Sequence, residues 1–426
     1  MKIIIDQSGY PLLNIGDWAM LQVAIQRIYA LWSNCSIQVF TTSPEKLAKY
    51  CPNTKPLLPN GRNIWLSPVF SPAYKIPSRS FVQLWSNCEN QFRRQSPEIV
   101  RSFINLKLKR HSSQRASDFQ TFMDAIHEAD LVIASGGGYI TDSFKYHAGG
   151  VLETLLIANS IGKPTAMFGQ GLGPLRDPDL LAKATAVFPK VKLISLREKR
   201  SGISFLKSFN VPTERFMTTG DDAIEMAYQG RNPHPGNGIG INLRVAYYAD
   251  INSALLETVR TSLQNAAKLL SAPLIPVPIS LKSEGEELSD SMAICKLLKG
   301  YDDAADGGKL IDTPQKVIQQ IGRCSVVVTG SYHAGVFALA QGIPVIGLAK
   351  SEYYADKFLG LADQFGVGCE VILLNNQQLK ENLLTAICQA WNNSEKLRPH
   401  LLDAAEKQIT LGISAYNKLY EIMNNK

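Results

Sequence analysis

Residues 326–348 read VVVTGSYHAGVFALAQGIPVIGL: an apolar run, a glycine turn that carries a histidine, a short helical segment and a second apolar run. The run 326–329 predicts a buried parallel strand that ends at Gly330, so Ser331 and His333 lie where the next helix begins. Open α/β sheets bind ligands beyond the carboxyl ends of such strands, and helix N-termini favour anions. The same residues equally fit a local cap whose histidine satisfies backbone groups, so both interpretations stay open at this point.

The composition is that of an ordinary globular protein. The chain has 426 residues, of which 45% are hydrophobic and 19% are charged, and this length suffices for roughly two to three domains with sizeable cores. It contains no apolar run of about 18 residues and begins with a short strand pattern, not a signal peptide, which predicts a cytoplasmic protein. Seven scattered cysteines without a CxxC pair argue against a disulfide framework and against a thiolate zinc site.

Positive charge is concentrated between residues 93 and 115. The formal net charge of the chain is +7, and this segment contains seven cations and a single acid, Glu98. The cations are Arg93, Arg94, Arg101, Lys107, Lys109, Arg110 and Arg115. Such a patch suits anionic lipid, an anionic polymer or a phosphorylated acceptor, whereas the simpler interpretation is a solvated helix face. Zinc-finger spacing, an RNP-type strand and a basic zipper are all missing, so nucleic-acid binding is not predicted.

Strand-like apolar runs alternate with helical patterns in both halves of the chain. The first half has candidate strands at 2–6, 37–41, 131–135, 165–170 and 193–196. The second half has candidate strands at 238–243, 274–279, 309–311, 326–329, 345–348 and 370–374. This alternation predicts an α/β fold with two Rossmann-like lobes that face a cleft.

The expected lobes are separated by GRNPHPGNG at 230–238, where seven of nine residues are glycine, proline or asparagine. We therefore predict one lobe at 1–229, a linker at 230–238, a second lobe at 239–395 and a helical segment at 396–426. The terminal helical pattern gives no docking place, and packing across the lobe junction is one possibility. Residues 52–77 are rich in proline and aromatic residues, which predicts a long loop, either a lid or a surface insertion.

Seven short motifs follow one another in the chain. They are NIGD (14–17), SGGG (135–138), GQGLGP (169–174), ISLREKRS (194–201), TGDDA (219–223), GINLR (240–244) and SYHA (331–334), the last followed by QGIP and a lysine-bearing segment. In this order they resemble the polysaccharide pyruvyl transferase family, from about residue 9 to about residue 375. Each motif alone is weak, but their common order over two α/β halves is a more specific signal.

The resemblance implies a GT-B-like fold and an enzyme that transfers an enolpyruvyl unit from phosphoenolpyruvate to sugar hydroxyls, closing a pyruvate ketal. The acceptor would be a polysaccharide or its lipid-linked precursor. Residues 1–229 would then form the acceptor side and residues 239–395 the donor side. Phosphoenolpyruvate is expected as donor substrate and no further cofactor, and the enzyme would be cytoplasmic, with contact to a membrane surface as an option.

A phosphoenolpyruvate donor carries a phosphate and a carboxylate, so its site needs fixed cations, preferably a planar guanidinium. Arg197 and Arg244 each follow a candidate strand and are expected to bind the donor, although a surface ion pair is the alternative for either. The triple glycine permits close backbone approach to a ligand or simply makes a tight turn. The remaining residues expected at the donor are Ser331, Lys350, Lys357, Gly137 and Gly138.

Ketal formation also needs a proton for the methylene carbon of the donor and a base for the attacking hydroxyl. His333 is the expected catalytic residue, and the resemblance places the cleft histidine of the family there. Asp17 and Asp222 are the expected catalytic carboxylates, with helix capping as the alternative role for Asp17 and for one of Asp221 and Asp222. The family motif usually reads Arg-Leu-His, so Ser331 stands in place of an arginine. Either Lys350 or Lys357 supplies that charge, or the donor differs.

Two other functions remain open beside this one. A glycosyltransferase with a nucleotide-sugar donor would share the two-lobed fold, and the missing arginine favours it. A non-catalytic sugar-binding protein is the third option. A metal site is not expected, because the chain has no HExxH motif, and its one DxD, Asp177 to Asp179, reads as the start of a helix.

Overall fold

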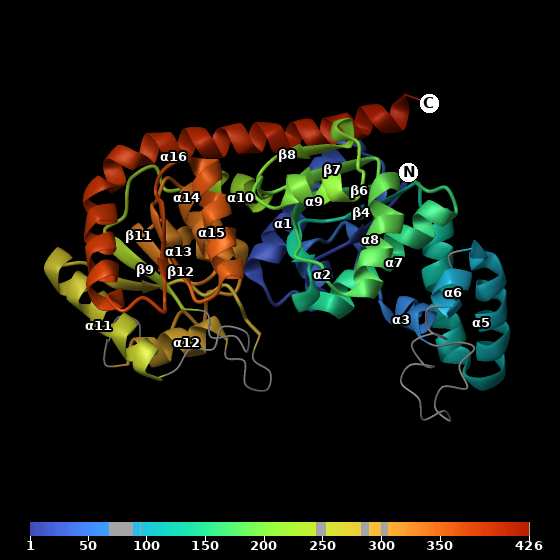
Figure 1. The fold of residues 1–426 in the computed structure, drawn as a ribbon, viewed down its shortest axis with the longest axis horizontal. Helices are drawn as coiled ribbons and strands as arrows, with labels where there is room; N and C mark the ends of the chain where they lie inside the picture. Colours follow the sequence, from blue (N-terminus) through green and yellow to red (C-terminus); the bar gives the residue numbers. More distant parts are fainter. Residues whose placement is uncertain (68–87, 94, 244–252, 283–288, 300–305, 426) are drawn as a thin grey trace.

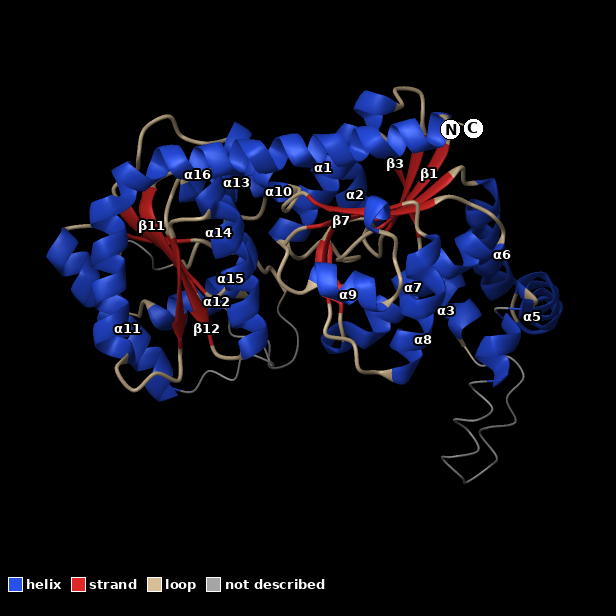
Figure 2. Cartoon of the chain, turned by 45° about the horizontal axis from the view of Figure 1, so that its top comes forward, coloured by secondary structure: helices blue, strands red, loops and turns tan. Residues whose placement is uncertain are grey.

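Two α/β lobes lie side by side, and a long helix runs along one side of both (Figure 1). The computed structural model describes residues 1–67, 88–93, 95–243, 253–282, 289–299 and 306–425. Each lobe is built on its own parallel sheet, and helices cover the sheets in Figure 2. The expected pair of Rossmann-like lobes is therefore confirmed. Among the described helices, none is long and apolar enough to span a membrane.

The N-terminal lobe contains an eight-stranded parallel sheet. Its strands are β1 (Lys2–Asp6), β2 (Ser36–Phe40), β3 (Thr54–Leu57), β4 (Leu131–Ala134), β5 (Gly137–Ile140), β6 (Thr165–Leu172), β7 (Leu193–Leu196) and β8 (Phe216–Thr218). The spatial order is β3-β2-β1-β4-β6-β7-β8, and β5 pairs with β6. The direction of winding reverses between β1 and β4, and such a reversal opens a ligand crevice at the carboxyl ends of the strands.

Both faces of this sheet are buried, because side chains of one strand alternate between two cores. On β1, Ile4 belongs to one apolar cluster, whereas Ile3 and Ile5 belong to another. Helices α3 (Asn60–Leu66), α5 (Pro97–His111), α6 (Ser113–Glu128), α7 (Lys145–Ser160), α8 (Pro178–Val187) and α9 (Gly202–Ser208) contribute to the Ile4 cluster. Helices α1 (Ile15–Leu31) and α2 (Pro44–Tyr50) contribute to the other.

The C-terminal lobe repeats this construction on a five-stranded parallel sheet, in the order β10-β9-β11-β12-β13. The strands are β9 (Gly238–Asn242), β10 (Leu274–Pro276), β11 (Cys324–Thr329), β12 (Val345–Ala349) and β13 (Cys369–Leu373). The helices are α11 (Ser253–Leu270), α12 (Asp290–Leu297), α13 (Pro314–Ile321), α14 (Tyr332–Ala340) and α15 (Glu352–Phe365). On β11, Val327 faces one core while Val326 and Val328 face the other. Winding reverses between β9 and β11, which places a second crevice at the end of β11.

Two sequence-based expectations are wrong. Residues 309–311 do not form a strand: Gly307 and Gly308 have φ angles of 59° and 76°, and they lead into a turn. The expected loop at 52–77 contains β3 and α3, and its residues 68–77 lie outside the described part of the chain. Pro56 misled the interpretation, because β3 is the edge strand of the sheet and an edge strand tolerates proline.

One helix connects the two lobes along their shared side. α16 (Leu379–Asn424) is 46 residues long and contains Pro399. Leu401 packs in the core of the C-terminal lobe, and Leu419 packs in the core of the N-terminal lobe. The helix therefore crosses the lobe junction, and the boundary expected between residues 395 and 396 falls inside it. α10 (Ala223–Gln229) also lies at the junction, where it packs against both α1 and α14.

Candidate active site

The turn that carries His333 sits where sequence and topology both place a ligand crevice. β11 ends at Thr329, and α14 begins at Tyr332, so His333 lies in the first turn of that helix. The Ser331 amide donates to Oγ1 of Thr329 at 2.8 Å, and the Ser331 side chain makes no capping hydrogen bond. Both Ser331 and His333 are buried. The N-terminal lobe contributes to the burial of His333, because Gly16 lies against its ring.

The closing contact is made by Gly16 of α1. A methyl group on Gly16 would overlap the ring of His333, so only glycine allows the two lobes to approach this closely here. The α1 terminus is held by Asn14, whose Oδ1 accepts from the amides of Gly16 and Asp17 at 3.0 and 3.2 Å. Asn14 is therefore the helix cap, and the alternative role of Asp17 as a cap is wrong.

A backbone bridge fixes the same junction. The amide of Ile15 donates to the carbonyl of Ile279 at 3.0 Å, and the amide of Leu281 donates to the carbonyl of Leu13 at 2.8 Å. These bonds cross from the N-terminal lobe to the C-terminal lobe directly beside Gly16. The NIGD motif thus joins the lobes at the position of His333.

Asp221 lies between His333 and Arg197 and is fully buried there. Its Oδ2 is 3.7 Å from Nε2 of His333 and 3.9 Å from Nη1 of Arg197, and its Oδ1 accepts from the amide of Ala223 at 2.9 Å. Burial acts to raise the pKa of Asp221, but His333, Arg197 and the Ala223 amide together hold that pKa below its ordinary value. Asp221 is thus a carboxylate that faces the imidazole of His333 and the guanidinium of Arg197.

Arg197 follows β7 and lies in a glycine-lined slot. A methyl group on Gly138 would overlap its guanidinium, and one on Gly171 would lie 2.7 Å from its Nε. The ring of Tyr332 stacks against the guanidinium, 4.1 Å from Cζ to the ring centre. Gly138 therefore leaves room for the arginine. Gly137 does not contact the arginine in the same way, since a methyl group there would meet the ring of Tyr139. Five surfaces therefore fix the orientation of Arg197: the two glycines, the tyrosine ring, Asp221 and the β7 backbone.

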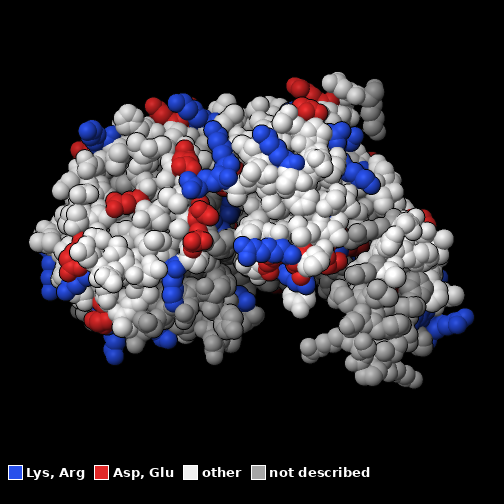
Figure 3. Space-filling model, viewed as in Figure 1, with Lys and Arg blue, Asp and Glu red and all other residues white. Residues whose placement is uncertain are grey.

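A cleft of about 930 Å³ opens beside this group. Figure 3 shows a groove between the lobes, bordered by charged side chains of both signs. The lining includes Arg197, Tyr332 and the two slot glycines from the group just described. The charged side chains of the lining are Arg176, Arg197, Glu198, Arg200, Glu352, Asp356 and Lys357. Four cations and three acids accordingly line one cleft, so the cations exceed the acids by one and suit the anionic groups of a ligand.

The structure separates the remaining expected donor residues. Lys357 lines the cleft, and its Nζ lies 5.2 Å from the ring centre of Tyr354. Lys350 follows β12 and is half-buried, outside the cleft lining. Arg244 lies outside the described residues, so its role stays a prediction. In the described part of the chain, no group of three or more His, Cys, Asp or Glu side chains is arranged to hold a metal ion.

Asp222 belongs to a different cluster, behind the cleft. Its Oδ1 is 2.6 Å from Nη1 of Arg27, and its Oδ2 accepts from the Tyr416 hydroxyl at 3.0 Å. Glu225 also pairs with Arg27, at 2.7 Å. Burial raises the pKa of Asp222, and the charge of Arg27 opposes only part of that rise. The cluster ties α10, α1 and α16 together, so the contacts of Asp222 are structural, and Asp221 is the carboxylate beside His333.

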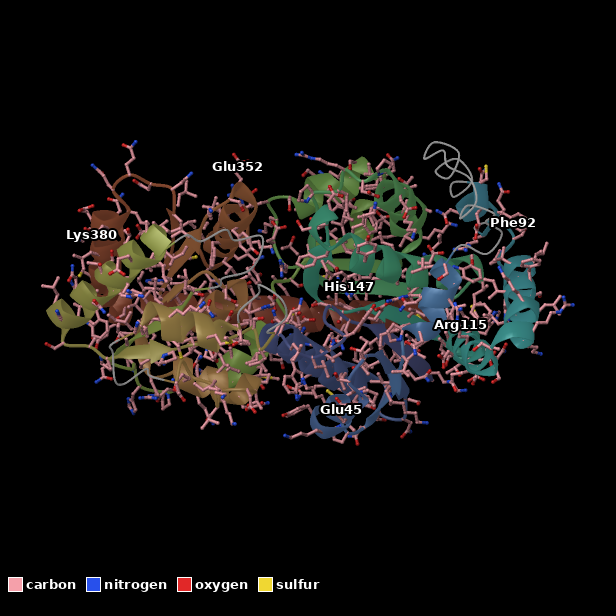
Figure 4. The ribbon with its side chains drawn as sticks, turned by 90° about the horizontal axis from the view of Figure 1, so that it is seen from below. Glu45, Phe92, Arg115, His147, Glu352 and Lys380 are labelled. Carbon is pink, nitrogen blue, oxygen red and sulfur yellow. The ribbon has the colours of Figure 1, made fainter. Side chains whose placement is uncertain are left out.

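Asp17 is half-buried on the N-terminal side of the site, next to an aromatic group that the sequence did not reveal. His147 lies between the rings of Tyr10 and Tyr139, with centroid distances of 4.7 and 4.9 Å. Burial lowers the pKa of His147, although the nearby charge of Asp17 opposes that shift. Figure 4 shows His147 in the N-terminal lobe, near the middle of the molecule. No motif pointed to this histidine, because its neighbours come from three separate segments.

Other proteins share this fold. The chain is similar to a Listeria monocytogenes protein described as a UDP-N-acetylglucosamine 2-epimerase, with TM-score 0.55, 12% identity, and coverage of 100% of this chain and 96% of that chain. It is similar to a UDP-glucose:anthocyanidin 3-O-glucosyltransferase in complex with UDP, with TM-score 0.53, 10% identity, and coverage of 100% and 99%. The corresponding values for the Neisseria meningitidis UDP-GlcNAc 2-epimerase bound to UDP-GlcNAc are 0.51, 13%, 99% and 99%. At these identities the likeness shows a GT-B-like fold alone.

The sequence itself gives a closer assignment. No curated protein sequence matches the chain. The sequence profile of one family, described as polysaccharide pyruvyl transferase, matches residues 14–352, a span that begins at Asn14 of the NIGD motif and includes His333. That span contains Arg197, Asp221 and the whole glycine slot. The chain therefore belongs to the polysaccharide pyruvyl transferase family and is a transferase enzyme.

Proposed function

We propose that this enzyme transfers the pyruvyl unit of phosphoenolpyruvate to two hydroxyls of a sugar and closes a ketal. The observation that carries the proposal is the position of Arg197, held by glycines and a tyrosine ring at a cleft beside the Asp221–His333 pair. A guanidinium fixed in this way suits a carboxylate or phosphate that needs two parallel hydrogen bonds. The cleft cations Arg176 and Lys357 suit the second anionic group of the donor, whereas Arg200 is paired with Asp363 at 3.0 Å.

The proposed reaction balances in two additions. The first sugar hydroxyl adds to C2 of phosphoenolpyruvate, and a proton enters at C3, which turns the methylene carbon into a methyl group. The C2–O bond to phosphate then breaks, and the second hydroxyl adds to C2. Inorganic phosphate leaves with the proton of that hydroxyl, so the products are the pyruvate ketal and phosphate. The step needs no oxidant, reductant or further cofactor.

His333 is the proposed proton donor to C3, and Asp221 is the proposed positioning residue. The 3.7 Å separation brings the carboxylate close enough to stabilise an imidazolium and to fix the orientation of the ring. In this assignment Asp221 takes the role that the TGDDA motif first suggested for Asp222. Asp222 is assigned a structural role at the lobe junction, because it forms a buried ion pair with Arg27.

The acceptor is proposed to bind on the N-terminal lobe, where Asp17, Tyr139 and His147 gather at the carboxyl ends of β1 and β4. Aromatic rings beside carboxylate and imidazole groups are suited to sugar rings and their hydroxyls. Residues 239–395 would then serve as the donor side. A polysaccharide or its lipid-linked precursor as acceptor, and a cytoplasmic location at a membrane surface, are part of the same proposal.

A nucleotide-sugar donor is the competing function. Two observations favour it: Ser331 stands where the family usually has arginine, and a structural neighbour was solved in complex with UDP. In the proposed function, Tyr332 compensates by holding Arg197 through ring stacking, and Lys357 supplies the additional positive charge of the cleft. A sugar-binding protein without turnover is the third alternative.

A thermal-shift comparison separates the three functions. We expect phosphoenolpyruvate to raise the melting temperature of the protein in a concentration-dependent way, since a ligand that binds only the folded state stabilises it. UDP and inorganic phosphate serve as the competing ligands. A melting temperature raised by UDP and not by phosphoenolpyruvate would replace the proposed donor. A melting temperature raised by acceptor glycans, with no release of inorganic phosphate from phosphoenolpyruvate in their presence, would support the sugar-binding alternative.

A further inference from the structure

Helix α5 has two apolar faces, one buried and one exposed. Val100, Ile104 and Leu108 are buried against the N-terminal lobe. Ile99 and Leu106 point the other way and are 60% and 55% exposed. At 3.6 residues per turn, the buried residues and the exposed ones lie on opposite sides of the helix, each within an arc of about 80° or less. The outer stripe continues with Phe103, which is 42% exposed.

Cations border this outer stripe. Lys107 and Lys109 lie on either side of it, Arg110 continues it by one turn, and Arg115 follows at the start of α6. All four are exposed. Two other described cations of the basic segment form ion pairs: Arg93 is buried with Glu89, and Arg101 pairs with Asp124 and Glu98.

The stripe and its cations occupy one end of the molecule. α5 is the outermost helix of the N-terminal lobe in Figures 1 and 2, and Lys and Arg side chains project from that edge in Figure 3. Figure 4 places Phe92 and Arg115 at this end and Lys380 at the opposite end. The C-terminal lobe therefore does not obstruct this face.

We propose that this face, defined by Ile99, Phe103, Leu106, Lys107, Lys109, Arg110 and Arg115, binds the surface of an anionic lipid bilayer. A bilayer offers both complementary chemistries at once, hydrocarbon for the apolar stripe and phosphate headgroups for the cations that border it. An anionic polymer matches only the cations. A second protein copy would bring the same positive charge against itself, so charge complementarity favours the lipid surface.

This inference assigns a surface of the protein to the membrane location of the proposed function, and it does not depend on the proposed donor. α5 contributes no residue to the cleft, so loss of membrane binding and loss of donor binding are separate outcomes. In combination with the proposed acceptor, the face would hold the enzyme at the surface where a lipid-linked sugar is presented. The N-terminal lobe, which carries the proposed acceptor side, is the lobe in contact with the bilayer.

Vesicle cosedimentation tests the proposal with the full-length protein. The lipids are phosphatidylcholine alone and phosphatidylcholine mixed with phosphatidylglycerol, and the wild-type protein is expected to bind only the mixed vesicles strongly. Lys109→Gln with Arg110→Gln should lower the partition coefficient about thirtyfold, the factor contributed by two interfacial cations. Ile99→Ser with Leu106→Ser should lower it by about tenfold or more, because the apolar stripe can no longer insert.

Matched controls lie on the other lobe. Leu269→Ser with Leu310→Ser removes two side chains of comparable exposure, and Lys380→Gln with Lys396→Gln removes two exposed cations. Both control variants should bind the mixed vesicles like the wild type. Melting temperatures equal to that of the wild type verify that the α5 variants are folded.

Three results would overturn the proposal. The first is equal binding of the wild type to neutral and anionic vesicles, or no binding to either. The second is loss of binding in the cation variant but not in the apolar variant, which would show purely electrostatic attraction without insertion of the apolar stripe. The third is a wild-type dimer that dissociates in the apolar variant without any vesicle binding, which would identify the face as an interface between two copies.

Discussion

Replacement of Arg197 by lysine tests the donor site most directly. Lysine keeps the positive charge but loses the planar fork and the stacking on Tyr332, which lies 4.1 Å from the guanidinium carbon. The stacking is present with and without the donor, so its loss affects the orientation of the side chain and the stability of the protein. One lost charge-assisted hydrogen bond to the donor costs about 1.5–3 kcal/mol, so donor binding should weaken about tenfold or more.

Isothermal titration calorimetry with phosphoenolpyruvate measures this change. Arg200→Lys is the matched control, because Arg200 also lines the cleft but is 40% exposed and pairs with Asp363 at 3.0 Å. Its substitution should change donor binding by less than about 1 kcal/mol. An Arg197→Lys variant that binds the donor as tightly as the wild type would refute the bidentate role. Equal losses of donor affinity in Arg197→Lys and Arg200→Lys would refute a special role for the arginine held between the two glycines.

Four further predictions address the site and its frame. His333→Ala should lower turnover by about 10² to 10⁴ while phosphoenolpyruvate still raises the melting temperature, and normal turnover in a phosphate-release assay would exclude catalysis by this histidine. Gly16→Ala should lower both kcat and the melting temperature, because its methyl group overlaps the His333 ring; an unchanged kcat would contradict the tight approach of the lobes. Asp222→Asn should destabilise the protein by about 3 kcal/mol in urea unfolding, because Arg27 loses a buried partner, but should leave kcat of the folded protein nearly unchanged. Burial acts to raise the pKa of Glu153, but Lys183 and other partners hold that pKa below its ordinary value. The carboxylate therefore stabilises the fold above about pH 4.3, the ordinary pKa of a glutamate in the unfolded chain. This contribution to the free energy of unfolding is lost as the pH falls through the lowered pKa. The unfolding free energy of Glu153→Gln should therefore fall less between neutral and acidic pH than that of the wild type, and parallel pH profiles would contradict this.

The sequence predicted those parts of the fold whose local pattern is unambiguous. Residues 326–329 form the buried core of β11, and the turn after them carries His333 at the start of α14, as the apolar run and the glycine indicate. β3 was missed because edge position, which makes Pro56 acceptable, is a property of the assembled sheet and not of the segment. The strand expected at 309–311 failed for the opposite reason, since two glycines with positive φ outweighed a short apolar pattern.

Within the site, the sequence identified the motifs but not which of two adjacent carboxylates lies beside His333. Asp221 and Asp222 are adjacent, and nothing in TGDDA distinguishes them. The distinction comes from Arg27 and Tyr416, which are distant in sequence and form hydrogen bonds with Asp222. Arg197 was expected from its place after a strand, whereas its slot between Gly138 and Gly171 required two further segments to meet. Long-range packing, which one sequence does not encode locally, accounts for each of these differences.

The long helix α16 restricts how the two lobes can move. Leu401 anchors it in one core and Leu419 in the other, and a helix cannot stretch between two anchors. The backbone bridge from 13–15 to 279–281 gives a second fixed crossing beside His333. A third crossing lies at the cleft, where Arg200 pairs with Asp363 of α15 at 3.0 Å. Sliding or separation of the lobes would therefore require these contacts to break, and with them the close approach of Gly16 to His333.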